Sequence, residues 1–462
     1  MRHTKRMVAI LAAATLALTA CGDDGGDEGD TPEETETTEE GGEETEEGTE
    51  GEEGEGEEAV DLSGTEVSVF GAPTSIEADA INGVIEEFFN GPTGSNAFFE
   101  GSDSFESQVQ IRVDGGNPPD IAIYPQPGAV IDQAERGNAI ALEDMGFDIA
   151  ELEERFGEYL MSLGEYDGKH YGIPTNVNFK SLVWYNIPVF EAEGYEIPTT
   201  WEDLVALSEQ MVADGYTPWA IGTGSDDATG WPATDWMEDI VLRQAGTDVY
   251  DGWVTNEVPF DDPAIIEAAN TFDSILNAEG FVVGGKSTIP DIDFRDIPAA
   301  IIGEEPEALL HRQASFITNF FPEGSEFGTD YGVFPFPSIN GTEGALIAGE
   351  LATVFNDRPE VREFINVFTD EPAQCAQGSY EGVGRISPNV NTTADCYENE
   401  VVATSAESTL NALREGTARF DASDLMPPQV GSGSFWTAMN EWMRGGDIES
   451  LLSDVQASWP AS

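Results

Sequence analysis

Apolar residues recur with strand and helix periods along the chain after residue 60. Residues 64–72 (GTEVSVFGA) alternate between apolar and polar positions and predict a strand. In residues 75–90 the apolar side chains fall on one stripe at helical spacing, which predicts a helix. Residues 108–113 and 121–124 predict two further strands separated by a Gly/Pro turn.

The same pattern predicts helices farther along. Residues 200–215 begin with a capping box from Thr200 to Asp203 and end at a glycine, and residues 357–372 are amphipathic. Strands alternate with helices throughout, without an internal repeat, which indicates an α/β fold.

The first 20 residues have the composition of an export signal. Basic residues at positions 2, 5 and 6 precede a short apolar run that is too short to cross a membrane. The run ends in LTAC, which resembles the lipobox of bacterial lipoproteins and implies that Cys21 is lipidated. The alternative is an ordinary secretory peptide cut nearby, with Cys21 incidental. No later segment has enough consecutive apolar residues to span a bilayer.

Residues 21–59 are built from Gly, Glu, Asp and Thr, and they contain 20 of the 90 acidic residues. Such a segment buries too little apolar surface to fold, so we expect a disordered tether. A tail that binds a partner is the alternative. The segment would hold a folded domain away from the membrane.

The roughly 400 residues that follow exceed one hydrophobic core and indicate two domains. The whole chain has a formal net charge of −72, and most of that excess lies beyond the tether. Nucleic-acid binding is excluded, because phosphate contacts need a basic face. We expect a highly hydrated surface suited to saline surroundings, where salt screens self-repulsion.

Cysteine and histidine are scarce. With Cys21 lipidated, Cys375 and Cys396 remain as a pair that predicts a disulfide in an exported protein, with two free thiols as the alternative. His170 and His311 are isolated in the sequence, so neither a metal site nor a Ser/His/Asp arrangement is predicted. We expect no metal and no cofactor.

The placement of tryptophan indicates sugar binding. Several of the nine tryptophans stand beside polar residues at the ends of predicted elements, as in GWPATDW and GSFW. Aromatic rings support the C–H faces of a sugar, and carboxylates, amides and guanidiniums bind its hydroxyl groups. Any single tryptophan could instead belong to the core.

Several segments resemble the carbohydrate-binding group of the extracellular solute-binding proteins of bacterial ABC importers, and above all its alpha-glucoside-binding lipoproteins. They are spread over residues 65–440: GGNPPDIAIYPQPG, KSLVWYN, PTTWEDL, TPWAIGTGSDDATGWPATDWMEDIVLRQAG, FNDRPEV, GRISPN and FDASDLMPPQVGSGSFW. The resemblance implies a two-lobed, maltose-binding-like (type II) α/β fold with a ligand cleft between lobes. Lobe 1 would comprise residues 60–176 plus 338–388, and lobe 2 would comprise residues 177–337 plus 389–462.

The resemblance also implies a set of ligand-binding residues. It consists of Glu77, Tyr124, Gln126, Asn178, Trp231, Asp235, Trp236, Glu350, Arg385 and Trp436, with Asp424 lining or capping the same region. Alternatives are open for three of them: a helix N-terminal charge for Glu77, a helix cap for Asp235 and a structural ion pair for Arg385. Glu350 is expected where a strand passes into a loop.

The implied function is capture of alpha-linked di- or oligosaccharides by lobe closure and their delivery to the transmembrane permease subunits of an ABC importer. The protein would be a monomer on the outer face of the cell membrane, held by its lipid anchor and without enzymatic activity. A surface-tethered glycoside hydrolase is the main alternative, because it too pairs aromatic residues with carboxylates. A surface adhesion protein is the other alternative.

Overall fold

The computed structural model describes residues 60–380 and 383–461. The predicted signal peptide, the tether and Cys21 lie outside the described residues. Within the described part, no helix is both long and apolar enough to span a membrane.

The larger sheet is mixed and has six strands. It contains β1 (Glu66–Gly71), β2 (Asn96–Gly101), β3 (Ile121–Tyr124), β6 (Ile173–Phe179), β10 (Ala345–Val354) and β11 (Ala418–Phe420). Strand β1 is parallel to β2 and β3, whereas the long strand β10 is antiparallel to β3 and β6 and parallel to β11. Segments that are far apart in the sequence therefore meet along β10.

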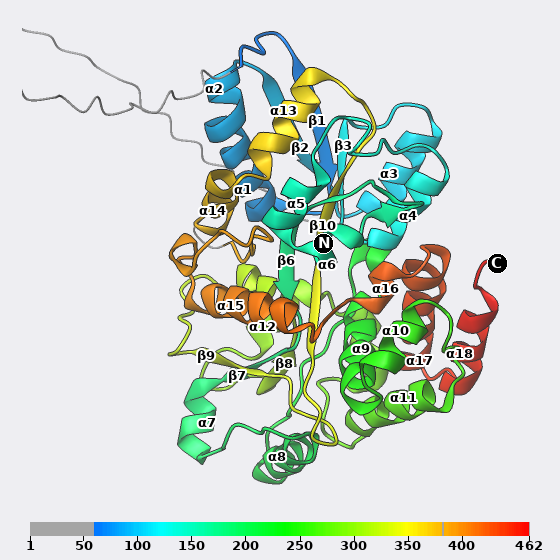
Figure 1. Cartoon of the computed structure of the whole chain (residues 1–462). Helices are drawn as coiled ribbons and strands as arrows, with labels where there is room; N and C mark the ends of the chain where they lie inside the picture. Colours follow the sequence, from blue (N-terminus) through cyan, green and yellow to red (C-terminus); the bar gives the residue numbers. More distant parts are fainter. Residues whose placement is uncertain (1–59, 381–382, 462) are drawn as a thin grey trace, which may run out of the picture. The chain divides into compact units, whose positions relative to one another are not determined.

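Both faces of this sheet are covered, as Figure 1 shows for β1 to β3. One core cluster joins Val67, Val69 and Ile121 to α1 (Ser75–Val84), the π-helix η1 (Ile85–Asn90) and α13 (Pro359–Phe368). A second joins Phe70 and Ala122 to α3 (Phe105–Asp114) and α4 (Pro127–Glu135). Successive strand residues point to opposite faces, so each strand supplies both clusters.

A second sheet has three antiparallel strands, with β7 between its two neighbours. It contains β7 (Leu182–Asn186), β8 (Leu310–Arg312) and β9 (Tyr331–Pro335). The third core cluster joins this sheet to six helices: α8 (Trp201–Asp214), α9 (Trp231–Gln244), α10 (Thr247–Val254), α11 (Pro263–Leu276), α17 (Trp436–Met443) and α18 (Ile448–Ala457). Five tryptophans are buried in it: Trp201, Trp219, Trp236, Trp253 and Trp442.

The remaining elements are short or connect these layers. The helices are α2 (Gly91–Thr93), α5 (Ile149–Phe156), α6 (Glu158–Ser162), α7 (Ile187–Glu193), α12 (Ile297–Ala300), α14 (Glu371–Gly378), α15 (Glu400–Glu415) and α16 (Ala422–Leu425). The 3₁₀ segments are η2 (Asp226–Ala228), η3 (Lys286–Asp291), η4 (Phe294–Asp296), η5 (Ser315–Phe320) and η6 (Ala394–Cys396), η7 (Gln429–Phe435) is a π-helix, and β4 (Glu165–Tyr166) pairs with β5 (Lys169–His170).

The structure confirms most of the predicted elements. Strands β1 and β3 and helices α1, α8 and α13 lie where the hydrophobic pattern placed them, and the Thr200 hydroxyl accepts a hydrogen bond from the Asp203 N–H at 3.2 Å. The predicted strand over 108–113 is wrong, because these residues belong to helix α3. Their alternation is also a helical stripe: Phe105, Val109 and Val113 are buried four residues apart, whereas Ile111 is 70% exposed.

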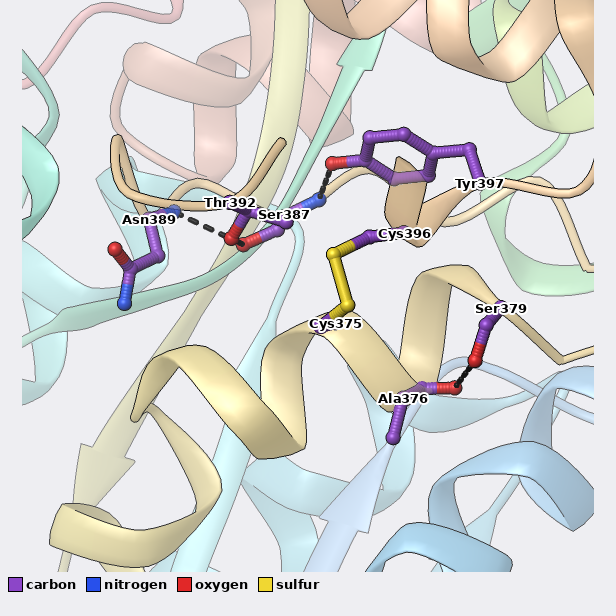
Figure 2. The surroundings of a disulfide bond; sticks show 8 residues. All are labelled: Cys375, Ala376, Ser379, Ser387, Asn389, Thr392, Cys396 and Tyr397. Carbon is purple, nitrogen blue, oxygen red and sulfur yellow. Dashed lines mark hydrogen bonds between the residues drawn. A yellow bond between two sulfur atoms is a disulfide. The ribbon is translucent and has the colours of Figure 1, made fainter. Parts of the chain in front are cut away.

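Cys375 of α14 and Cys396 of η6 form a disulfide, as predicted (Figure 2). Their Cα atoms lie 4.9 Å apart. Beside the bond, the Ser387 N–H donates to the Tyr397 hydroxyl at 3.1 Å and the Thr392 hydroxyl donates to the Ser387 hydroxyl at 2.8 Å. The disulfide therefore joins α14 to a loop that is already held by polar contacts.

Candidate ligand-binding site

A cavity of about 190 Å³ lies where loops of the six-stranded sheet meet loops that follow the three-stranded sheet. The lining residues include polar, charged and aromatic side chains. They are Ala72, Pro73, Thr74, Glu77, Ser102, Asp103, Glu106, Pro125, Gln126, Asn176, Asn178, Lys180, Ser225, Ala228, Trp231, Phe294, Arg295, Phe316, Phe320, Ala348, Gly349, Glu350, Asp424 and Trp436.

One wall of the cavity comes from β10 and β6. These strands pair with Asn178 opposite Ala348 and Asn176 opposite Glu350, so two amides and one carboxylate follow one another along it. The pairing shifts register between Glu350 and Leu351. Glu350 thus lies inside a ten-residue strand rather than at its end, and a local irregularity takes the place of the expected strand-to-loop junction.

The Glu350 carboxylate is held by Arg385. The Arg385 Nη2 lies 2.5 Å from Glu350 Oε2 and Nη1 lies 3.4 Å from Oε1. Arg385 is 2% exposed and does not line the cavity. Its guanidinium therefore fixes the orientation of Glu350 from behind the wall.

Glu77 enters the cavity from the first turn of α1. Burial raises the pKa of its carboxyl to about 7, and the charge of Glu350 adds to the rise while that of Arg385 opposes it. A carboxyl with such a pKa exchanges its proton near neutrality, so it can donate a hydrogen bond to a ligand hydroxyl as well as accept one.

Two tryptophans stand at the first residues of helices, as the sequence led us to expect. Trp231 begins α9 and Trp436 begins α17, and both line the cavity. A Cβ on Gly230 would lie 2.5 Å from the Trp436 carbonyl oxygen, and the Gly230 φ of 122° also favours glycine. Glycine therefore lets the two helix starts come together, and the Asn440 side chain joins them by donating to the Thr229 carbonyl at 2.8 Å.

The two rings have different surroundings. Trp231 is partly exposed and packs edge-on against Phe294, with 5.0 Å between ring centroids. Phe316 lies beside Trp231 and Phe294, with 5.9 Å between the ring centroids of Phe316 and Trp231. Trp436 is 3% exposed, and its indole N–H donates to the Ser423 hydroxyl at 3.2 Å. Trp231 thus offers an accessible apolar surface, and Trp436 forms a fixed part of the wall.

A buried network of charges lies beneath this surface. The Lys180 ammonium contacts Asp235 at 2.8 Å and Asp421 at 2.5 Å, and it lies 5.2 Å from the centre of the Trp231 ring. Arg312 joins Asp235 at 2.9 Å to Asp239 at 2.5 Å. Burial raises the pKa of Asp235, although both cations oppose the rise. Asp235 is therefore a structural partner of Lys180 rather than a helix cap or an exposed acceptor.

The carboxyl groups of Asp424 and Glu238 also belong to this region. Burial raises the pKa of Asp424, which lines the cavity, well above its usual range, and the neighbouring Asp421 adds to the rise. The carboxyl oxygens of Asp235, Glu238 and Asp421 lie within 4.8 Å of one another, a spacing that could hold a cation. The Lys180 ammonium already bonds to two of these residues, so we assign no metal to the cluster.

The structure brings six of the ten residues expected to bind ligand to the cavity wall: Glu77, Gln126, Asn178, Trp231, Glu350 and Trp436. Asp235 and Arg385 lie behind the wall. Tyr124 follows the alternation of β3 into the core and packs edge-on against Phe105. Trp236 is five residues after Trp231, which places it on the opposite side of α9, and it stacks on Phe272 at 4.9 Å.

Several lining residues were not predicted. Asn176 stands two residues before Asn178 on the same strand, and strand periodicity could have identified it. Lys180, Asp103, Arg295 and Phe294 carried no such signal, because their proximity depends on how distant loops meet. The wall as a whole offers aromatic surface beside carboxyl, amide and cationic groups, which suits a polyhydroxylated ligand.

Comparison with known proteins agrees with this interpretation. Residues 76–374 match the family model described as bacterial extracellular solute-binding protein. The chain is 38% identical over 411 residues to the alpha-glucosides-binding periplasmic protein AglE of Rhizobium meliloti (strain 1021), covering 86% of this chain and 88% of that protein. It is 36% identical over 400 residues to the osmoprotective compounds-binding protein GgtB of Synechocystis sp. (strain ATCC 27184 / PCC 6803 / Kazusa), covering 86% and 92%.

Among solved structures, the bacterial solute receptor AcbH, described as having an exclusive preference for β-D-galactopyranose, has a TM-score of 0.70 at 18% identity. The match covers 85% of this chain and 97% of that one. The fold is therefore the expected two-lobed, maltose-binding-like α/β fold of sugar-binding proteins. The family and the relatives are solute-binding proteins rather than enzymes, and this excludes the glycoside hydrolase alternative. The chain belongs to the bacterial extracellular solute-binding proteins, as the substrate-binding component of an ABC importer for sugars.

Proposed function

We propose that the protein captures alpha-linked glucosides, such as maltose, trehalose or sucrose, and delivers them to the permease of its importer. The observation that carries the proposal is the pairing of Trp231 and Trp436 with the carboxyl and amide groups of Glu77, Glu350 and Asn178 in one cavity. The 38% identity to a protein named for alpha-glucosides supports the same ligand class.

The aromatic, carboxyl and amide residues of the wall then have different roles. Trp231 supports the C–H face of a sugar ring, and Trp436 closes the other side of the site. Glu350, oriented by Arg385, accepts hydrogen bonds from neighbouring hydroxyls, while Asn178 and Gln126 donate or accept. The Asn178 Oδ1 is buried and has no hydrogen-bond partner within the described residues, so a ligand hydroxyl would satisfy it.

Binding is proposed to close two lobes over the ligand by hinge motion. Lobe 1 would comprise residues 60–176 plus 338–388 and lobe 2 residues 177–337 plus 389–462. The proposed boundary after residue 176 falls within β6, shortly before β7, and the boundary after residue 337 falls between β9 and β10; these segments join the two sheets. Closure would exclude water and strengthen every polar contact with the sugar.

The proposal also includes the anchor. Lipidation of Cys21 and a disordered segment over residues 21–59 would hold the folded domain at the outer face of the membrane, within reach of the permease. Palmitate labelling of cells that express the wild type and Cys21→Ala tests this. Label and membrane association in the wild type, both lost in the variant, would support the anchor, whereas unlabelled wild-type protein would contradict it.

Isothermal titration against maltose, trehalose, sucrose, palatinose, maltotriose and glucose tests the ligand class. Cellobiose is the matched control, because it differs from maltose only in the configuration of its linkage. We expect tight binding to one or two alpha-linked sugars and none to cellobiose. Equal binding of maltose and cellobiose, or no detectable binding of any sugar in the panel, would contradict the proposal.

A further inference from the structure

Two pairs of side chains meet across the rim of the cavity. The Arg295 Nη2 donates to Asp103 Oδ1 at 2.9 Å, and the Ser107 hydroxyl donates to Asp227 Oδ2 at 2.6 Å. Both contacts join positions more than a hundred residues apart in the chain. Arg295 and Asp103 line the cavity, whereas Ser107 and Asp227 do not.

In each pair, the two partners lie on segments that connect strands of different sheets. Asp103 lies between β2 and α3 and Ser107 lies in α3, on the chain that joins β2 to β3 of the six-stranded sheet. Asp227 lies in η2 and Arg295 in η4, on the chain that joins β7 to β8 of the three-stranded sheet. In the proposed division they stand on opposite lobes, so opening of the cavity would break both contacts.

The charges at this rim make the two sides depend on the Arg295 cation for their attraction. The Arg295 guanidinium lies 2.9 Å from Asp103, 2.8 Å from Asp293 and 3.9 Å from Asp226, so one cation faces three carboxylates. Asp227 adds a fourth acidic residue next to Asp226. Without the cation, acidic side chains of the two sides would face one another and repel.

We propose that these four residues, Asp103, Ser107, Asp227 and Arg295, form a clasp that keeps the cavity closed and so slows release of the bound sugar. The clasp rests on the proposed lobe closure and adds a kinetic role for residues that need not contact the ligand. It acts on the dissociation rate, because its contacts exist only in the closed form.

Ser107→Ala tests the clasp away from the ligand, since Ser107 does not line the cavity. Arg295→Gln tests the ion pairs. Ser408→Ala is the matched control for the first, because within the described part of the chain the Ser408 hydroxyl bonds only to the Thr404 carbonyl of its own helix. Arg444→Gln is the control for the second, because it removes one positive charge from an exposed pair with Asp291 away from the cavity.

Stopped-flow tryptophan fluorescence with maltose and with trehalose gives the association and dissociation rates. We expect each clasp variant to raise the dissociation rate roughly two- to fivefold, the ratio that a partly exposed polar contact supports. The association rate should stay within about twofold, and both controls should match the wild type. Higher salt should speed dissociation from the wild type more than from Arg295→Gln.

Hydrogen–deuterium exchange of the protein saturated with sugar supplies a second measurement. Backbone amides of residues 102–108 and 225–229 should exchange faster in both clasp variants than in the two controls. Wild-type dissociation and exchange rates in Ser107→Ala would overturn the clasp, even if Arg295→Gln weakened binding, because Arg295 would then act as a ligand contact alone. If the wild type binds neither sugar, the proposed ligand class fails, and the same variants and controls are compared with the sugar that the protein does bind.

Discussion

At the scale of single residues, the two tryptophans of GWPATDW have different roles, one at the cavity and one in the core. Trp231 faces the cavity, whereas Trp236 lies in the core with its ring stacked on Phe272 and edge-on to Trp219. Five helical positions turn a side chain by roughly 140°, so the two rings cannot serve the same surface. The second aromatic wall comes instead from Trp436 at the start of α17.

Replacement of Trp436 by alanine should weaken sugar binding by about 1–3 kcal/mol, the range typical of buried aromatic side chains at binding hot spots. Titration calorimetry well below the melting temperature checks it. Trp236→Phe is the control: it should lower the melting temperature and leave the Kd within about twofold. An unchanged Kd in Trp436→Ala would place this ring in the core as well.

Glu77 should make stability depend on pH. Its pKa is about 7 in the folded protein and 4.5 in the unfolded chain, so between these values the unfolded chain loses a proton that the folded protein keeps. Rising pH therefore favours unfolding: the stabilisation present below pH 4.5 is lost as the pH approaches 7. Glu77→Gln should remove this part of the fall in melting temperature between pH 5 and 7.5.

Melting curves of the variant and of Glu87→Gln, which alters an exposed side chain of the same segment, separate this effect from a general change in charge. A parallel pH dependence in the wild type and Glu77→Gln would contradict the assignment. The same comparison with saturating sugar shows whether the ligand changes the proton affinity of Glu77.

At the scale of elements, strands and helices were more predictable than the contacts between them. The periods of β1, β3, α8 and α13 are local properties of sequence. The Lys180 contacts with Asp235 and Asp421 join positions 55 and 241 residues apart, and no local pattern records them. Helix α3 shows the limit even of local pattern, because its spacing of valine and isoleucine is compatible with both periods until the partner surface is known.

The disulfide should stabilise the connection between α14 and η6. It closes a loop of 21 residues, and the chain-entropy model gives such a loop about 3 kcal/mol. Cys375→Ser should therefore lower the melting temperature under oxidising conditions without changing which sugar is bound, because neither cysteine lines the cavity. Reduction of the wild type should reproduce the loss. Equal melting temperatures of the oxidised wild type and the variant would contradict the prediction.

At the scale of the whole molecule, the two-lobed fold and the binding of sugars were predictable because the segments that resemble sugar-binding proteins are spread over most of the chain. The cavity was predictable only in part. Helix starts that carry Trp231 and Trp436 are visible in the sequence, whereas the β6–β10 wall and the clasp arise from pairing between distant segments. Charge is the remaining property that belongs to the whole chain.

The net charge of −72 should make stability depend strongly on salt. Like charges on a compact protein repel one another more than on the expanded unfolded chain, and the Debye length falls from roughly 14 Å at 0.05 M to about 3 Å at 1 M salt. The melting temperature should therefore rise steeply between about 0.05 and 1 M NaCl. Potassium chloride should have the same effect at equal ionic strength, since screening does not depend on the identity of the cation. A constant melting temperature across this range would mean that the acidic side chains are too well hydrated or paired for repulsion to matter, and the inference of a saline habitat would fall with it.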